Sequence, residues 1–183
     1  PLVPSGLLLI GGQQIPKFIL SAYGSLADVG IYGLAYQIAG FSALSVLGVQ
    51  TAITPSILAN HENEKTPKML VELFEQFLVV AFIFCSSLSI FSNELVLVFS
   101  SPHYAGAAKL IPVLSFSIVL NTFYIFFPGK FIKGKSKAQL LPSLFCFVVA
   151  IVAGVAIVKL DAVIGAAVAT LLSSMSFFLI WVY

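Results

Sequence analysis

The sequence predicts an all-α integral membrane protein, built as a bundle of six transmembrane helices. The chain has 183 residues, of which 60% are hydrophobic and 9% are charged, and its mean hydropathy is +1.08. A soluble domain carries about a quarter charged residues. Six apolar segments follow one another, each with the roughly 20 residues that a helix needs to cross a bilayer. The predicted spans are 2–23, 29–59, 70–91, 105–127, 138–158 and 162–183.

Capping residues and prolines mark the first two spans. The first span carries Pro16, which removes a backbone hydrogen bond and bends a helix. Ser25 and Asp28 suit the start of the second span, 29–59. That span is longer than the bilayer requires, so it is expected to tilt or to project beyond the membrane, with Pro55 near its inner end. Four of its small residues are predicted to form a helix-packing face: Gly33, Ala35, Ala39 and Gly40.

Similar signals mark the remaining four spans. Thr66 and Pro67 suit the beginning of the third helix, and Asp161 suits the beginning of the sixth. Pro112 and Pro142 fall inside the fourth and fifth spans and are expected to bend them. The sixth span also has small residues that are predicted to pack against a neighbouring helix: Gly165, Ala166, Ala167 and Ala169.

The lysines are concentrated in alternate breaks between the spans. The breaks at 60–69 and 129–137 hold six of them: Lys65, Lys68, Lys130, Lys133, Lys135 and Lys137. The other breaks hold only Lys159, with Lys109 just beyond the break at 92–104. Because positively charged short loops stay in the cytoplasm, both ends of this multi-pass chain are predicted to be cytoplasmic. The break at 92–104 is then the longest on the outer side.

Polar residues in the first span form the strongest candidate binding site. Gln13, Lys17 and Ser21 are four residues apart and share a helix face, with Gln14 one step round. A lysine near the centre of a spanning helix costs about 2.5–3.5 kcal/mol, so it normally faces a polar cavity or a partner. A hydrated face with one cation suits an anionic substrate. The alternative is that Lys17, six residues before the outer end of the span at Tyr23, extends its side chain to the lipid headgroups.

A second polar group lies in the fourth span, where Asn121, Thr122 and Tyr124 follow one another. These side chains either form hydrogen bonds between helices or line a cavity. Glu72 and Glu75 are interpreted as a solvated helix start near the lysine-bearing break. The predicted substrate-binding residues are therefore Lys17, Gln13, Gln14, Ser21, Asn121 and Tyr124.

The sequence offers no pattern typical of an enzyme. It has no Ser/His/Asp set, no metal-ligand spacing and no glycine-rich phosphate loop, so neither catalysis nor a cofactor or metal is predicted. Cys85 and Cys146 fall within spans and are interpreted as small apolar residues. The net charge of +2 is too small to indicate nucleic-acid binding.

Several short motifs resemble, in order, those of the polysaccharide-transport flippases of the MOP superfamily, which move O-antigen and related repeat units. The run DVGIYGLAYQIA at 28–39 resembles the "VGxYxxAxxI" helix start of that family. Further similar elements are TAITP at 51–55, FSSPHYAGA at 99–107, Gly134-Lys135, and VIGAAVATLLS at 163–173. Lys17 falls where the family often has a basic residue, although Ile15-Pro16 precedes it here in place of the family's usual acid.

The resemblance implies the C-terminal half of a transporter with about twelve or more helices, arranged as two lobes around a central cavity. The chain begins at Pro1 and ends on Trp181-Val182-Tyr183 within its last span, which also favours a piece of a longer protein. The resemblance further implies an undecaprenyl-diphosphate-linked oligosaccharide as substrate and the bacterial inner membrane as location. The implied partners are membrane lipid, the N-terminal half of the same protein and a glycan polymerase.

Two other functions stay open at this point. A multidrug or organic-cation antiporter of the same superfamily would favour buried acids over a buried lysine. A membrane-embedded polysaccharide polymerase or ligase would need a large outer loop with Arg or His. The break at 92–104 offers only Glu94 and His103.

Overall fold

The computed structural model describes residues 2–44, 46, 48, 66–126, 140–159 and 161–182, and every regular element among them is a helix. The elements are α1 (Leu2–Tyr23), α2 (Leu26–Gly40), α4 (Thr66–Ile90), α5 (Ser92–Phe99), η1 (Pro102–Lys109), α6 (Ile111–Thr122), η2 (Phe123–Phe126), α8 (Leu140–Val158) and α9 (Ala162–Val182). The predicted all-α class is confirmed. The second span lies only partly within the described residues, and Pro55 lies outside them.

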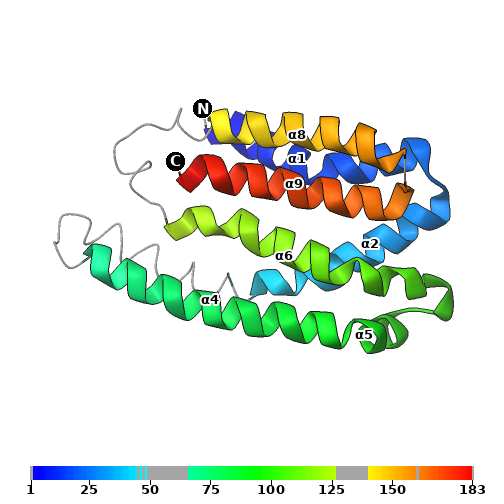
Figure 1. Ribbon diagram of the computed structural model, residues 1–183, viewed down its shortest axis with the longest axis horizontal. Helices are drawn as coiled ribbons and strands as arrows, with labels where there is room; N and C mark the ends of the chain where they lie inside the picture. The colour runs from blue at the N-terminus through cyan, green and yellow to red at the C-terminus, as the bar shows by residue number, and fades with distance from the viewer. Residues whose placement is uncertain are drawn as a thin grey trace.

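The long helices run side by side along one axis (Figure 1). α1, α8 and α9 pack together on one side, α2 and α6 lie beside them, and α4 packs against α6 at the opposite edge. α1 begins and α9 ends at the same end of the bundle, where α4 also begins and α6 ends. Successive long helices therefore alternate in direction, as they do in a chain that crosses a membrane repeatedly.

Within the part of the chain that the structure describes, three helices are long and apolar enough to cross a membrane: Lys68–Ile90, Leu140–Val158 and Ala162–Trp181. The pair Pro102–Lys109 and Ile111–Thr122 passes the same test together, although it is bent by 49°. Such helices are those of a multi-pass α-helical membrane protein. α1 has the predicted bounds but is not among the three, because Gln13, Gln14 and Lys17 lower its hydropathy.

The predicted break at 92–104 contains short helices between α4 and α6. The chain turns at Phe91 and then forms α5 and η1. The helix α5 buries the side chain of Val96, which is 1% exposed. Its acidic residue, Glu94, lies in the first turn, where a negative charge is favourable. The fourth predicted span, 105–127, is accordingly divided into η1, α6 and η2.

The prolines of the fourth and fifth spans lie at helix starts and do not bend helix interiors, which corrects that expectation. Pro112 is at the first turn of α6, where a backbone N–H has no partner within the helix to lose. Pro142 is likewise the third residue of α8. The 49° bend precedes Pro112, at Leu110. Pro16 does lie inside α1, as predicted, and is buried.

Small residues bring α1, α8 and α9 close together. A Cβ at Gly154 in α8 would lie 2.5 Å from Ile19 Cδ1 in α1, so any larger residue would require the Ile19 side chain to move. A Cβ at Gly165 would lie 2.7 Å from the Ile157 carbonyl oxygen. Ala166, Ala167 and Ala169 are at most 1% exposed, which confirms the packing role predicted for this part of α9.

The start of α2 is capped as the sequence predicts. The Ser25 hydroxyl accepts from Asp28 N–H at 3.2 Å, and Asp28 Oδ2 accepts from Ser25 N–H at 2.8 Å. These two bonds form a capping box. The backbone N–H and hydroxyl of Ser25 lower the pKa of Asp28, so this carboxylate is held in the cap.

Candidate functional site

One face of α2 has almost no side chains. Gly30, Gly33, Gln37 and Gly40 are spaced by three and four residues and therefore share this face, which we name the glycine face. Ala35 and Ala39 are fully buried on another side of the helix. The small-residue face predicted for α2 is thus divided in two: its alanines pack, whereas Gly33 and Gly40 line cavities.

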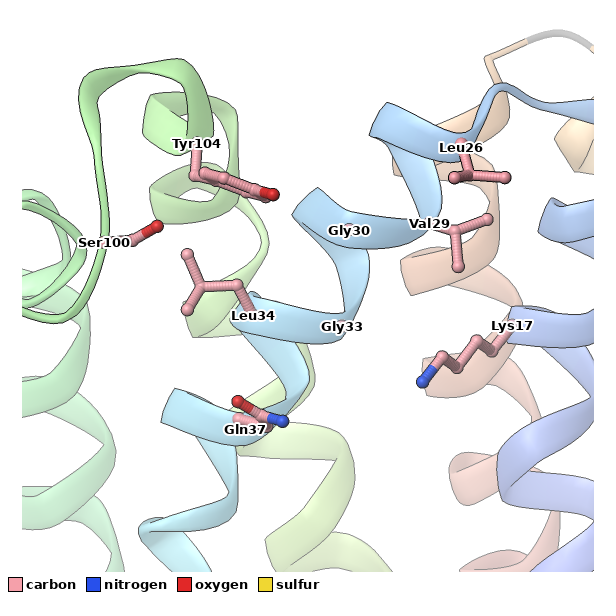
Figure 2. A pocket seen from close by; sticks show the side chains of 9 residues that line it. All are labelled: Lys17, Leu26, Val29, Gly30, Gly33, Leu34, Gln37, Ser100 and Tyr104. Atoms are coloured by element: carbon pink, nitrogen blue, oxygen red, sulfur yellow. The ribbon is translucent and has the colours of Figure 1, made fainter.

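The first cavity, which we name the lysine groove, is open and has a volume of about 560 Å³. The glycine face is its floor, between α1 on one side and the α5–η1 region on the other (Figure 2). Its lining residues are Lys17, Leu26, Val29, Gly30, Gly33, Leu34, Gln37, Ser100 and Tyr104. Tyr104 forms one wall, and a Cβ at Gly30 would lie 3.1 Å from its Cε1.

Lys17 extends from α1 across the groove toward α2. A Cβ at Gly33 would lie 3.9 Å from Lys17 Nζ, so any longer side chain at Gly33 would compete with the amine for space. Figure 2 shows the amine on the side of Gly33 and Gln37 and directed away from Leu26. A lysine reaching for the headgroups would extend the other way, toward Tyr23.

The lysine groove has one charged residue among its described lining residues, and it is Lys17. Asp28 precedes the glycine face, but its carboxylate is occupied by Ser25 in the helix cap. The other polar groups of the lining are the side chains of Gln37, Ser100 and Tyr104, all uncharged. The Lys17 side chain is exposed in the open groove, so its amine is accessible to an anion.

The second cavity, which we name the amide pocket, is more enclosed and has a volume of about 370 Å³. It lies between α1, α2, α6 and α9, and Gly40 of the glycine face contributes to it. Its lining residues are Leu9, Gln13, Tyr36, Gly40, Ala43, Ser117, Ile118, Asn121, Thr122 and Thr170. None of these described lining residues is charged.

Asn121 is the most buried amide of this pocket, with 6% exposure. Its Nδ2 donates to the Ser117 carbonyl at 3.2 Å and to Ser174 Oγ at 2.5 Å. Its Oδ1 has no hydrogen-bond partner among the described residues. The two roles considered for Asn121 are therefore combined: it joins α6 to α9 and it also lines a cavity.

The structure brings together only part of the predicted site. Gln13 and Asn121 both line the amide pocket, and Lys17 lies one helical turn from Gln13, in the lysine groove. Gln14 lines neither cavity. Ser21 also lines neither, and its exposed hydroxyl donates to the Phe18 carbonyl of the same helix at 2.7 Å.

Tyr124 lies in η2, and its side chain is outside the described part of the structure. Three further residues line the cavities but were not predicted from the sequence: Gln37, Tyr36 and Tyr104. The spacing of Gly30, Gly33, Gln37 and Gly40 was the one signal that could have indicated the groove.

No group of three or more His, Cys, Asp or Glu side chains in the described ranges could hold a metal ion. Cys85 and Cys146 are free thiols, and Cys146 Sγ lies 2.9 Å from Ser173 Oγ. Comparison with protein-family models, with curated proteins and with solved structures finds no match for this chain. The function is therefore inferred from the residues that line the two cavities.

Proposed function

We propose that this chain is one lobe of a two-lobed flippase that moves an undecaprenyl-diphosphate-linked oligosaccharide across the bacterial inner membrane. The observation that carries the proposal is the position of Lys17, the one charge among the described residues that line an open groove. A lysine interacts with phosphate as a point charge. A diphosphate in the groove would neutralise the amine and offset the cost of keeping it away from bulk water.

The open shape of the lysine groove supports a second lobe. Its described lining comes from α1, α2 and the α5–η1 region, and the groove is open. A polar groove exposed to lipid would be costly, because lipid offers no hydrogen bonds. A missing N-terminal half placed over the glycine face would convert the groove into a central cavity, and rocking of the two lobes would expose it to each side in turn.

The direction of the helices supports six crossings with both ends in the cytoplasm. α1 begins and α9 ends at one end of the bundle, which requires an even number of crossings. The predicted lysine-bearing breaks adjoin the starts of α4 and α8 at that same end, so it is the cytoplasmic one under the positive-inside rule. The lysine groove then lies nearer the outer side. In this arrangement a glycan polymerase on the outer side would receive the flipped substrate.

The lining also distinguishes the proposal from the two alternatives. A cation antiporter needs an acid facing its substrate, whereas both described linings lack a carboxylate. A polymerase or ligase needs reactive groups in an outer loop, and α5 and η1 occupy that position with short helices. The lysine groove therefore favours transport of an anionic substrate.

Charge-changing variants at Lys17 test the proposal. We expect Lys17→Arg to keep most transport, because a cation remains in the groove, and Lys17→Gln and Lys17→Ala to lose at least about tenfold, the equivalent of one charge-assisted hydrogen bond. Transport is measured as surface polysaccharide in a flippase-deficient strain complemented by the full-length protein. Immunoblotting of membranes verifies that each variant accumulates.

Lys109→Gln is the matched control, because Lys109 is exposed in η1 and lines neither cavity. It removes the same charge and should leave transport unchanged. Normal surface polysaccharide from a stably accumulated Lys17→Ala protein would refute the role of Lys17 and the anion-binding groove with it.

A further inference from the structure

The amide pocket has a different chemistry from the lysine groove beside it. Its described lining carries amide and hydroxyl groups but no charge. We propose that it binds a sugar ring of the transported glycolipid, the ring attached directly to the diphosphate, and so contributes to selection of the sugar. This inference rests on the proposed flippase function, because Lys17 is taken to hold the diphosphate.

Asn121 indicates what the ligand must offer. Its Nδ2 is fully used by Ser117 and Ser174, while its Oδ1 accepts nothing from the described residues. A buried acceptor without a donor is unfavourable. A ligand hydroxyl is a donor that a small adjustment of the pocket would bring to this oxygen. The diphosphate that links a sugar to its lipid does not fit this position, since both of its phosphates are fully ionised at neutral pH and present only acceptors.

Tyr36 and Gln13 provide the remaining chemistry for a sugar. The Tyr36 ring stacks on Tyr32 with centroids 6.2 Å apart and 22° between planes, and the Tyr32 hydroxyl lies 2.8 Å from Thr170 Oγ1. The ring is therefore held in place and offers an apolar surface beside a hydroxyl. Gln13 adds an amide that both donates and accepts. Sugar rings have the matching combination of C–H faces and hydroxyl groups.

The two cavities are close enough for one substrate molecule to place its diphosphate in the lysine groove and its first sugar in the amide pocket. Gln13 and Lys17 are four residues apart on α1, which is a rise of about 6 Å. The glycine face continues past both residues, with Gly33 in the lysine groove and Gly40 in the amide pocket. A diphosphate at Lys17 thus places a directly attached hexose at Gln13, while the lipid chain can leave through the open side of the groove.

Binding of three probes to the full-length protein tests the inference. The probes are a polyprenyl diphosphate, the same lipid carrying a single hexose, and a neutral long-chain alkyl hexoside. The protein is placed in lipid nanodiscs prepared without glycosidic detergents. The variants are Gln13→Leu, Tyr36→Phe and Lys17→Gln, with Gln14→Leu as the matched control because Gln14 lines neither cavity.

We expect the hexose to increase affinity for the diphosphate lipid about tenfold or more. Gln13→Leu and Tyr36→Phe should each reduce that increase by about two- to tenfold, the range for one neutral hydrogen bond, and leave affinity for the bare diphosphate lipid unchanged. Lys17→Gln should weaken both diphosphate lipids and leave the neutral hexoside unaffected. Gln14→Leu should change none of these affinities.

The outcomes separate this inference from the proposed function. Binding of the bare diphosphate lipid with no preference for the hexose overturns the sugar pocket and leaves the flippase proposal standing. An equal effect of Gln13→Leu and Gln14→Leu also overturns the pocket. Binding of the neutral hexoside that depends on Gln13, without binding of either diphosphate lipid, supports the sugar pocket and refutes the flippase proposal.

Discussion

Lys17 and Gly33 act as a pair across the lysine groove. A Cβ at Gly33 would be in ordinary contact with the Lys17 amine, at 3.9 Å, so a side chain longer than that of alanine would reach into the space of the amine. Pro16 immediately before Lys17 is buried inside α1, so the lysine begins from a fixed part of the helix. The function proposed for Lys17 therefore depends on the small size of Gly33. A large residue at position 33 should impair transport although the charge of Lys17 is unchanged.

Gly33→Leu should abolish most transport, by about tenfold or more, because the leucine side chain would fill the space that the Lys17 amine occupies. Folding should be preserved, since leucine favours a helix over glycine by about 1 kcal/mol. Gly6→Leu makes the same replacement where a Cβ would meet nothing within 4 Å, so it should leave transport intact. Surface polysaccharide and membrane accumulation are measured for both. Equal transport by the two variants would show that the space at Gly33 is unimportant.

At the scale of the helices, α9 is the element that joins the others. Its Thr170 lies 2.8 Å from the Tyr32 hydroxyl of α2, its Ser174 accepts from Asn121 of α6, and its Ser173 donates to the Cys146 carbonyl of α8 at 2.9 Å. Such interhelical bonds average about 0.6 kcal/mol in membranes and reach about 1–2 kcal/mol. They position the helices whose side chains form the amide pocket.

The contact between α1 and α8 depends on the absence of a side chain at Gly154. Gly154→Ala should lower the thermal unfolding temperature of the purified protein, because its Cβ would overlap Ile19 and overpacking costs about 1–3 kcal/mol. The double change Gly154→Ala with Ile19→Ala should recover part of that loss by making space. Gly6→Ala is the control and should not lower the temperature. A Gly154→Ala protein as stable as the original would contradict the close approach of the two helices.

Some of these elements could be predicted from the sequence and others could not. α1, α4, α8 and α9 match the predicted spans within a few residues, because a long apolar run determines a spanning helix almost alone. α5 could not be predicted in the same way, since a helix of 8 residues depends on the neighbours that bury Val96.

The candidate site was predictable only in part. Lys17, Gln13 and Asn121 stand out as polar residues in apolar segments. Gln13 and Asn121 line the same pocket because α1 and α6 pack near each other. The periodicity of residues along one helix gives no information about which other helix packs beside it. The same limitation explains Ser21, which shares a helix face with Lys17 but lines neither cavity.

At the scale of the whole molecule, the two ends of the bundle differ. The predicted breaks with six lysines adjoin one end, and the turn at Gly24 with α5 and η1 forms the other. The lysine groove lies toward the second end, where Leu26 and Tyr104 border it. Orientation in the membrane therefore decides from which side the groove first meets its substrate.

Cysteine labelling should report this orientation directly. In a protein lacking Cys85 and Cys146, a cysteine at Gly24 should react with an impermeant thiol reagent in intact cells, whereas one at Ser136 should react only after the cells are opened. Ser136 lies outside the described residues and is chosen for its lysine-rich surroundings. Reaction of both positions from outside would exclude six crossings with cytoplasmic ends.

The packing of α1 has a consequence for biogenesis. α1 leaves the ribosome before α8 and α9, yet it packs chiefly against these two later helices. Its glutamines and lysine also make it a weaker substrate for insertion than α4, α8 or α9. α1 therefore reaches its final place only after α8 and α9 have been made. Truncation before α8 would leave it exposed to membrane quality control, even though every residue of α1 itself was still present.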